Sequence, residues 1–325
     1  MIDVGKGSVP GQSFHLGEYF SPGRIVRCSV VKVWGKGDDA DDGDRHSKGK
    51  KKNIDLSLRM EAVNAGLRRD AVFEGAQMVG CVKSVEDHGY LIDFGIKGAT
   101  GFLPRKRAEG VLQKGCIVDV VVKSVGTTGG STTAQLTALA ADVRGAVTQA
   151  WTGVDIDSLI PGMLVNVNVR NVLSDGLLVS FLTFFTGTID PFHLDRALAK
   201  CKAGQKVKAR VLYCDPGRKQ VSLSLLPHLV GWQSPDLPGR GEVYEQATVR
   251  RVDEGLGLAI DLPISGSAGM KESDADHTAK DAVYRSYAHI SNISDTQKID
   301  DLAKRFKQGQ VVKCRVVGFR QLDGL

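Results

Sequence analysis

The chain has 325 residues, of which 42% are hydrophobic and 25% are charged, a composition typical of globular protein that is long enough for several domains. It contains no signal peptide, and none of its apolar runs approaches the length of about 20 residues that a membrane-spanning helix needs. The sequence therefore predicts a soluble, non-secreted protein. The net charge of +6 fits a nucleic-acid partner without demonstrating one.

The first 64 residues predict an incomplete five-stranded unit that holds only its third to fifth strands, the third near Gly11. The alternating run at 24–34 predicts the fourth strand, and residues 53–59 predict the closing strand. Between them, residues 35–52 have almost no apolar side chain, so we expect a disordered insertion. The lysines at 48–52 are typical of a solvated hairpin tip, with a nuclear-import signal as the alternative.

Residues 70–140 predict the first complete unit. It includes an apolar strand at 88–94 and a second strand that ends in the basic segment before Ala108. Residues 141–158 follow as a helical connector, in which we expect Trp151 to pack against a neighbouring unit. Base stacking by this tryptophan is the alternative.

Residues 159–228 predict the second complete unit, and they show the pattern most clearly. An alternating strand begins at Gly162, Gly176 breaks it, and the run from Gly204 alternates again before residues 220–225 close the unit. That is five short strands with room for one helical turn after the third. We expect Trp232, which follows this unit, to pack in the same way as Trp151.

Residues 238–325 predict a fourth unit that lacks its closing strand. It carries a second polar insertion at 265–281, which is also expected to be mobile. Because a barrel without all its strands leaves open edges and unburied core, we expect the 325 residues to be part of a longer protein.

Glycines at matched positions indicate that the four units are repeats. Gly75 and Gly89 are 14 residues apart, as are Gly162 and Gly176, and Gly241 and Gly255. A fourth-strand glycine in each unit is followed, at every second position, by small or branched apolar residues: Val26, Cys28 and Val30; Val118, Val120 and Val122; Val207, Ala209 and Val211; Val312, Cys314 and Val316. Such a period of two marks a barrel interior. The predicted fold class is all-β, with tandem five-stranded OB-fold barrels joined by short helical connectors.

Several motifs resemble the S1 RNA-binding motif, an OB-fold family. The sequence Tyr-Ala-His-Ile-Ser at 287–291 resembles its third strand, and Leu-Ser-Leu at 56–58 and 223–225 resembles its closing strand. The phrases at 85–95, 100–104 and 190–194 are most similar to the S1 repeats of the eukaryotic ribosomal-RNA-processing protein five family. This resemblance implies a nucleolar assembly factor of the small-subunit processome. Its implied partners are precursor ribosomal RNA, small nucleolar ribonucleoprotein and other ribosome assembly factors.

In S1 motifs, aromatic residues around the second-strand glycine stack on unpaired bases, and a third-strand histidine contributes. The resemblance therefore implies RNA-binding residues in the second and fourth units: His88, Tyr90, Phe102, Arg105, Lys106, Arg107, Arg285, Tyr287, His289, Lys313 and Arg315. The alternative is that Phe102 is core and that the charges only solvate the rim. Outward positions on the fourth strands add a basic stripe suited to phosphate contact: Arg27, Lys208, Arg210, Lys313 and Arg315.

The third unit departs from this pattern, because it places Asp175 and Asp190 at the matching positions, where they would repel phosphate. We therefore expect it not to bind RNA through that face, and to serve as a spacer or protein contact.

Nothing in the sequence indicates catalysis. There is no G-x-S-x-G, H-E-x-x-H or G-x-x-x-x-G-K-[ST] motif, and the six cysteines include no C-x-x-C pair. We expect no enzyme activity, no cofactor, no metal, no small-molecule substrate and no membrane partner. Two main hypotheses remain: an RNA-binding assembly factor that contacts precursor ribosomal RNA, or a scaffold of tandem barrels that binds mainly proteins. An S1-repeat translation or transcription factor is a further alternative.

Overall fold

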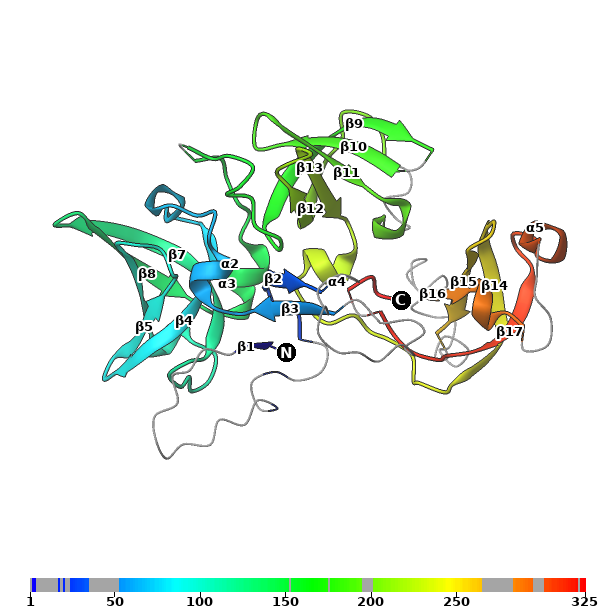
Figure 1. The fold of residues 1–325 in the computed structure, drawn as a ribbon, viewed down its shortest axis with the longest axis horizontal. Coiled ribbons are helices and arrows are strands. Elements are labelled where there is room, and N and C mark those ends of the chain that lie inside the picture. Colours follow the sequence, from blue (N-terminus) through cyan, green and yellow to red (C-terminus); the bar gives the residue numbers. More distant parts are fainter. Residues whose placement is uncertain are drawn as a thin grey trace, which may run out of the picture. The chain divides into compact units, whose positions relative to one another are not determined.

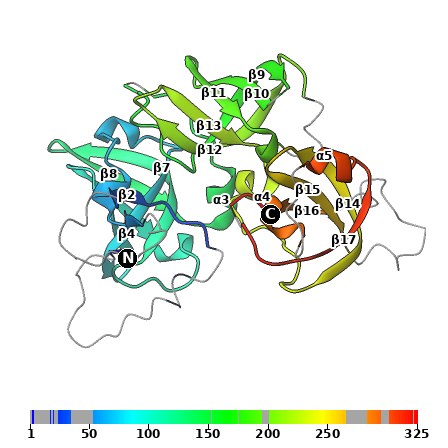
Figure 2. The same ribbon diagram turned by 45° about the vertical axis from the view of Figure 1, so that its right-hand side comes forward.

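The computed structural model describes residues 2–3, 17, 20, 24–34, 53–151, 153–174, 176–194, 201–264, 283–294, 301–320 and 322–325. They belong to two compact units, Met1–Gln233 and Ser234–Leu325 (Figures 1 and 2). The expected strand near Gly11 and the expected insertions at 35–52 and 265–281 lie outside the described residues. Strands dominate both units, which confirms the all-β fold class.

The second repeat is a closed barrel, here called barrel 2, with the strand order β4-β5-β6-β8-β7. Its strands are β4 (Gln77–Glu86), β5 (Gly89–Asp93), β6 (Ala99–Pro104), β7 (Ile117–Thr128) and β8 (Ser131–Thr137). Antiparallel pairing runs round the wall, and the parallel pairing of β6 with β8 closes it through four residue pairs, from Ala99–Thr132 to Phe102–Gln135. Val118, Val120 and Val122 point inward and are buried, as their spacing predicts.

The third repeat is also a closed barrel, here called barrel 3, with the order β10-β11-β13-β12-β9. Its strands are β9 (Leu164–Leu173), β10 (Gly176–Phe181), β11 (Phe185–Ile189), β12 (Lys206–Asp215) and β13 (Gln220–Ser224). The same parallel closure occurs here, but a single pair, Thr188 with Ser222, joins β11 to β13. The inward Ala209 and Val211 are fully buried.

The first repeat forms a three-stranded sheet of β1 (Ile2–Asp3), β3 (Ile54–Ser57) and β2 (Ser29–Val33). β1 pairs with β3 in parallel, as the third and fifth strands do in the closed barrels. The interior positions expected for this repeat are not buried: Val26 and Cys28 are exposed, and Val30 is 58% exposed. The reason is that the described part of this sheet has no opposite wall to cover them.

The unit Ser234–Leu325 is built on a four-stranded sheet in the order β16-β15-β14-β17. The strands are β14 (Val243–Asp253), β15 (Gly257–Pro263), β16 (Val283–His289) and β17 (Val311–Arg315). Its core is small and consists of Tyr244, Ala247, Val249, Leu258, Ile260 and Leu262. Val312, Cys314 and Val316 pack against this core but are only half-buried, so their inward phase is confirmed.

The helices in the described residues are short. They are α2 (Met60–Val63), η1 (Arg69–Ala71), η2 (Arg105–Arg107), α3 (Ala140–Gly145), η3 (Pro191–His193), α4 (Pro227–Val230), η6 (Ile290–Asn292) and α5 (Leu302–Arg305). Among the described residues of the helical connector expected at 141–158, only those of α3 are helical, and Trp151 beyond it stacks on Phe73 with 5.5 Å between ring centroids. None of the helices in the described residues is long and apolar enough to cross a membrane.

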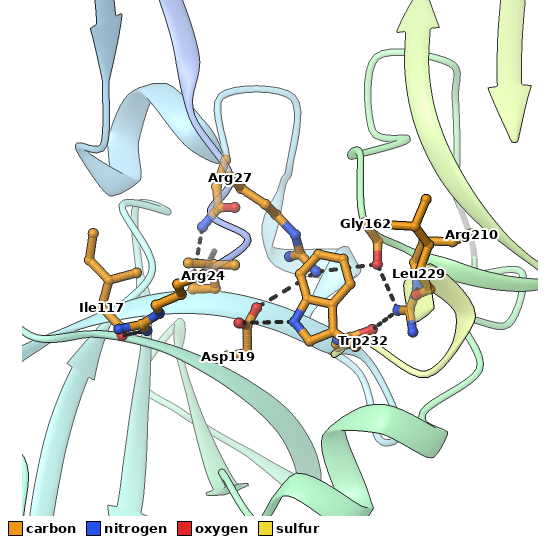
Figure 3. A network of polar contacts seen from close by, with 11 residues as sticks. Arg24, Arg27, Ile117, Asp119, Gly162, Arg210, Leu229 and Trp232 are labelled. Carbon is orange, nitrogen blue, oxygen red and sulfur yellow. Dashed lines mark hydrogen bonds and ion pairs between the residues drawn. The ribbon is translucent and has the colours of Figure 1, made fainter. Parts of the chain in front are cut away.

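A buried polar cluster joins the first three repeats (Figure 3). We call Arg27, Asp119, Arg210 and Trp232 the Trp232 cluster. The indole of Trp232 lies between two guanidinium groups, 5.4 Å from that of Arg27 and 4.8 Å from that of Arg210, and its Nε1 donates to Asp119 at 3.3 Å. Arg27 lies 3.8 Å from Asp119 as an ion pair. Three sequence repeats therefore meet at one indole ring, as expected for a packing tryptophan.

Arg210 is the most deeply held member of the Trp232 cluster, at 1% exposed. It donates to the backbone carbonyls of Leu229 (2.9 Å), Val230 (2.6 Å) and Gly162 (2.9 Å). Burial, and then the charge of Arg27, lower the pKa of Arg210 to about 10, and Asp119 opposes the shift. Burial likewise lowers the pKa of Arg27. Two members of the basic stripe expected on the surface are thus interior groups, because neighbouring repeats cover those strand faces.

Candidate nucleic-acid interface

Barrel 2 brings three of the predicted residues together around Gly89, at the start of β5. A Cβ at this position would meet the carbonyl oxygen of Leu103 and lie 2.8 Å from Cζ of Phe102. The half-buried ring of Phe102 therefore lies over the glycine, and only glycine leaves room for it. The exposed His88 comes directly before Gly89 in the β4–β5 turn.

Arg105 completes this site by folding back onto the same turn. Its Nε donates to the carbonyl of Asp87 at 3.1 Å and its Nη2 to that of Glu86 at 2.9 Å. Its backbone N–H donates to the carbonyl of His88 at 3.1 Å. An aromatic ring, an imidazole and a guanidinium thus share one edge of barrel 2. We call Gly89, His88, Phe102 and Arg105 the Gly89 site.

Tyr90 is not part of the exposed site, contrary to its inclusion among the predicted residues. It is 1% exposed, and its hydroxyl accepts a hydrogen bond from the backbone N–H of Leu112 at 3.2 Å. Its neighbour in the period-two strand, Gly89, occupies the outward phase instead, so the tyrosine ring lies in the barrel interior. Lys106 is exposed on η2, and Arg107 is half-buried.

The sheet of the compact unit Ser234–Leu325, called the second unit from here on, repeats the arrangement with Tyr287 in place of Phe102. A Cβ on Gly257 would meet the carbonyl of Ala288 and lie 3.0 Å from the ring and hydroxyl of Tyr287. Burial, and then Asp253, raise the pKa of Tyr287, to which Asp253 is also hydrogen-bonded. His289 is exposed, with its Nδ1 2.8 Å from the hydroxyl of Ser291.

The equivalent of Gly89 is Gly257, not Gly255 as the glycine spacing predicted. Gly257 pairs with His289 as Gly89 pairs with Pro104. The connection between β14 and β15 is longer than the one between β4 and β5, so equal spacing along the sequence does not mean an equal place in the sheet. The residue before this glycine is Leu256, 61% exposed, so no carboxylate stands there.

The predicted cations of the fourth repeat are not gathered at Tyr287. Arg285 lies two residues before it on β16, in the same outward phase. Lys313 and Arg315 lie on β17, at the other end of the sheet order from β16. Lys313 is also held by Glu245, with 2.7 Å between Nζ and the carboxylate. In this respect the Gly89 site is the better assembled of the two.

Barrel 3 has no aromatic ring over its corresponding glycine, Gly176. Thr188 takes the strand position of Phe102 and Tyr287, since it pairs with Leu178 as Phe102 pairs with Leu91. Asp190 is exposed, and its carboxylate accepts the backbone N–H of Phe192 at 2.8 Å, so it caps η3. Asp175 lies outside the described residues.

Metal ligands do not cluster in the parts of the chain that the structure describes: no group of three or more His, Cys, Asp or Glu side chains could hold an ion.

Comparison with known proteins finds similarity to one family of proteins. Residues 159–225 match the model of the "RRP5 S1 domain", and residues 233–325 match that of the "RRP5 OB-fold domain". These two parts of the chain are therefore similar to S1 and OB-fold domains of RRP5 proteins. The "rRNA biogenesis protein RRP5" of Arabidopsis thaliana is 32% identical over 323 residues, which cover 95% of this chain and 15% of the relative. "Protein RRP5 homolog" of Homo sapiens is 33% identical over 322 residues, covering 96% of this chain and 16% of that protein.

The mouse homologue is likewise 33% identical, over residues that cover 95% of this chain and 16% of that protein. The chain therefore corresponds to the S1-repeat region of RRP5 proteins and spans about a sixth of their length. The Arabidopsis relative is named as an rRNA biogenesis protein.

Some features of the sites had no sequence signal. The return of Arg105 onto the β4–β5 turn depends on carbonyl groups that face it only once the hairpin has formed. The shift from Gly255 to Gly257 depends on hairpin length. Residues 257–262 are all buried, so polar and apolar side chains do not alternate between an exposed and a covered face there. Without such alternation, the pairing register of β15 could not be predicted from the sequence.

Proposed function

We propose that the chain binds single-stranded segments of precursor ribosomal RNA during ribosome assembly in the nucleolus, as an RRP5-type factor of the small-subunit processome. The observation that carries the proposal is the recurrence of an aromatic ring packed over a glycine, beside an exposed histidine, in barrel 2 and in the second unit. A base stacked on such a ring contributes about 1–3 kcal/mol, and cations beside it contact phosphate. The relatives' names support ribosomal RNA as the RNA concerned.

Arg105 gives the Gly89 site its charge, and its side chain is already oriented by two carbonyl groups. Because a bound guanidinium has lost much of its rotamer freedom, it costs less to order when a phosphate arrives. We therefore assign the main RNA contact to barrel 2, and a second contact to Tyr287 and His289. Tyr90 and Lys313 are left out of the proposed interface, since the first is buried and the second is paired.

A scaffold role for part of the chain is the second candidate. It is favoured by barrel 3, where Thr188 and Asp190 replace the aromatic ring and the histidine of the other repeats. Small nucleolar ribonucleoprotein and assembly factors are the partners we propose for such a scaffold.

The test is RNA binding by the His88→Ala/Arg105→Ala variant of the full chain, measured by fluorescence anisotropy with a labelled mixed-sequence RNA 20-mer. We expect affinity to fall by about 1–3 kcal/mol, or roughly 5- to 150-fold. Lys97→Ala is the matched control, because it removes an exposed cation from the β5–β6 connection at the other end of barrel 2. If both variants bind like the wild type and melt like it, the Gly89 site is not an RNA site and the scaffold role is preferred.

A further inference from the structure

One face of barrel 3 is unused by the proposed function and lies at the opposite end of the barrel from Gly176. It surrounds the hairpin between β10 and β11. One row of paired residues crosses four strands there, from Lys206 through Asn168 and Ser180 to Thr186, and Lys208 pairs with Asn166 in the next row. Strand β10 separates this end from Gly176 by five residues, about 17 Å.

Six exposed side chains define what we call the hairpin face: Asn166, Asn168, Arg170, Phe184, Lys206 and Lys208. The strand residues alternate with buried valines and alanine, so their side chains point out of the barrel. The guanidinium of Arg170 leans across β10, with its Nε donating to the hydroxyl of Ser180 at 3.0 Å. All three cations therefore border the same row.

Charge on this face is of one sign. β9, β10 and β11 contain no aspartate or glutamate, and β12 contains none before Asp215, its last residue. Lys208 is seven residues from Asp215, about 23 Å along the strand, well beyond the Debye length at physiological salt. A polyanion meets three cations here without a carboxylate on the same strands.

The two outward asparagines are unusual strand residues. Asparagine is depleted in strands, because its amide competes with the backbone for hydrogen bonds. Here Asn166 and Asn168 hold successive outward positions on β9, and both are exposed. An amide offers donors and acceptors together, which suits the edges of unpaired bases.

The hairpin tip is strained in a way that presents an aromatic ring. Leu182 and Thr183 have φ of 43° and 76°, although neither is glycine and threonine is β-branched. The backbone N–H of Phe184 donates to the carbonyl of Leu182 at 3.0 Å, so Thr183 is the centre of a three-residue turn of the rare positive-φ kind. Phe184 is 64% exposed as a result, and it leans on Phe185 with 4.7 Å between ring centroids.

We propose that the hairpin face of barrel 3 is a third single-stranded RNA site, in which Phe184 stacks on a base and Lys206, Lys208 and Arg170 contact the adjoining phosphates. The inference rests on the proposed function, because it adds a site to a chain proposed to bind RNA. RNA is favoured over an acidic protein segment as the ligand. An acidic segment would contact the cations only, whereas RNA also has base edges that bind the two amides and base faces that stack on the ring which the strained turn exposes. Barrel 3 then contacts RNA through its hairpin end, while the end with Asp190 does not.

The test uses the full chain, the labelled RNA 20-mer, and a triple variant, Phe184→Ala/Lys206→Ala/Lys208→Ala. We expect affinity to fall about 5-fold or more through the lost stack. The slope of log affinity against log salt should become less negative by about 1.4, because two phosphate contacts to a single strand are lost. Arg218→Gln/Lys219→Asn is the matched control: it removes two exposed cations from the β12–β13 turn of the same barrel and should leave the slope unchanged.

The Gly89-site variant separates the two proposals. Loss of binding in His88→Ala/Arg105→Ala with wild-type affinity and salt slope in the triple variant would overturn the hairpin face and leave the proposed function standing. If the wild-type chain does not bind the 20-mer, both are overturned. A triple variant that loses binding to a polyglutamate peptide and keeps its RNA affinity would show an acidic-protein contact instead. Crosslinking of a 4-thiouridine RNA to Phe184, located by mass spectrometry, is the direct positive result.

Discussion

Replacing Asp119 by asparagine tests whether the Trp232 cluster holds the first three repeats together. The change is nearly isosteric, and the amide oxygen still accepts the indole N–H. What it removes is the carboxylate that faces two guanidinium groups, one of them 3.8 Å away. Arg27 and Arg210 then remain buried around one ring without a counter-charge in the cluster.

The magnitude follows from the distance and the burial. Two unit charges 3.8 Å apart attract by about 4 kcal/mol at an effective dielectric constant of about 20. The side chain of Arg27 is 5% exposed and that of Asp119 is 26% exposed, so solvent screens part of this. We expect Asp119→Asn to cost about 3 kcal/mol, the lower end of what breaking a buried pair costs. For a unit of this size that corresponds to about 6–12 °C in melting temperature.

Tryptophan fluorescence during thermal or urea unfolding is the assay, because Trp34, Trp151 and Trp232 all lie in the unit Met1–Gln233. Lys123→Gln is the control. It breaks an ion pair with Asp142 that is shorter, at 3.1 Å, but 40% and 33% exposed, and should cost less than about 1 kcal/mol.

A second-site change sharpens the test. Adding Arg27→Gln to Asp119→Asn removes one uncompensated charge and should recover part of the lost stability, a coupling of about 0.5–3 kcal/mol. If Asp119→Asn unfolds like the wild type, or costs no more than Lys123→Gln, the cluster does not join the repeats electrostatically.

Three further results are expected. Thr183→Gly should raise the melting temperature of its unit by about 2–4 °C. The reason is that glycine relieves backbone strain of about 1–3 kcal/mol, which exceeds its entropic cost of about 0.5–1 kcal/mol. A lower melting temperature would contradict the strain at Thr183. Burial, and then Glu242, raise the pKa of Tyr244 to about 12, above the about 10 of an unfolded tyrosine. The second unit should therefore lose stability as pH rises from about 10 towards 12, and Tyr244→Phe should remove that part of the loss. Tyrosinate absorbance of the wild type, compared with that of Tyr244→Phe, measures the titration of Tyr244. Gly89→Ala should lower the free energy of unfolding in urea by about 1–3 kcal/mol, because the added Cβ meets a backbone carbonyl. Gly126→Ala is the control: its Cβ would have no atom closer than 3.9 Å, so its unfolding free energy should change by less than about 0.5 kcal/mol. Equal effects of the two variants would contradict the close approach at Gly89.

The sequence predicted the barrels because period-two apolar strands and turn residues repeat at one phase. That signal reports which way a side chain points, and not whether anything covers it. Val122 and Val30 hold equivalent positions, yet the first is buried and the second is 58% exposed. Burial depends on the opposite wall, which local pattern does not encode.

The candidate site was predictable where it depends on residue type and obscure where it depends on neighbours. His88 and Phe102 follow from the S1 motif, and both lie beside Gly89. Arg27 and Arg210 looked like surface cations because alternation puts them outward from their own barrels. A side chain that points outward from one barrel is buried where a second repeat packs against that barrel. Only the packing of the repeats shows which outward side chains are covered in this way.

The seams that close the two barrels have a consequence for how they move. Four residue pairs join β6 to β8 in barrel 2, but one pair, Thr188 with Ser222, joins β11 to β13 in barrel 3. Opening a wall costs the hydrogen bonds and contacts across its weakest seam, so sub-global opening should begin there in barrel 3. Backbone amides of β13 that face β11 should then exchange with solvent faster than those of β8 that face β6. Barrel 3 would open at this seam while barrel 2 is still closed, so a pulling force or an unfoldase would unfold barrel 3 before barrel 2.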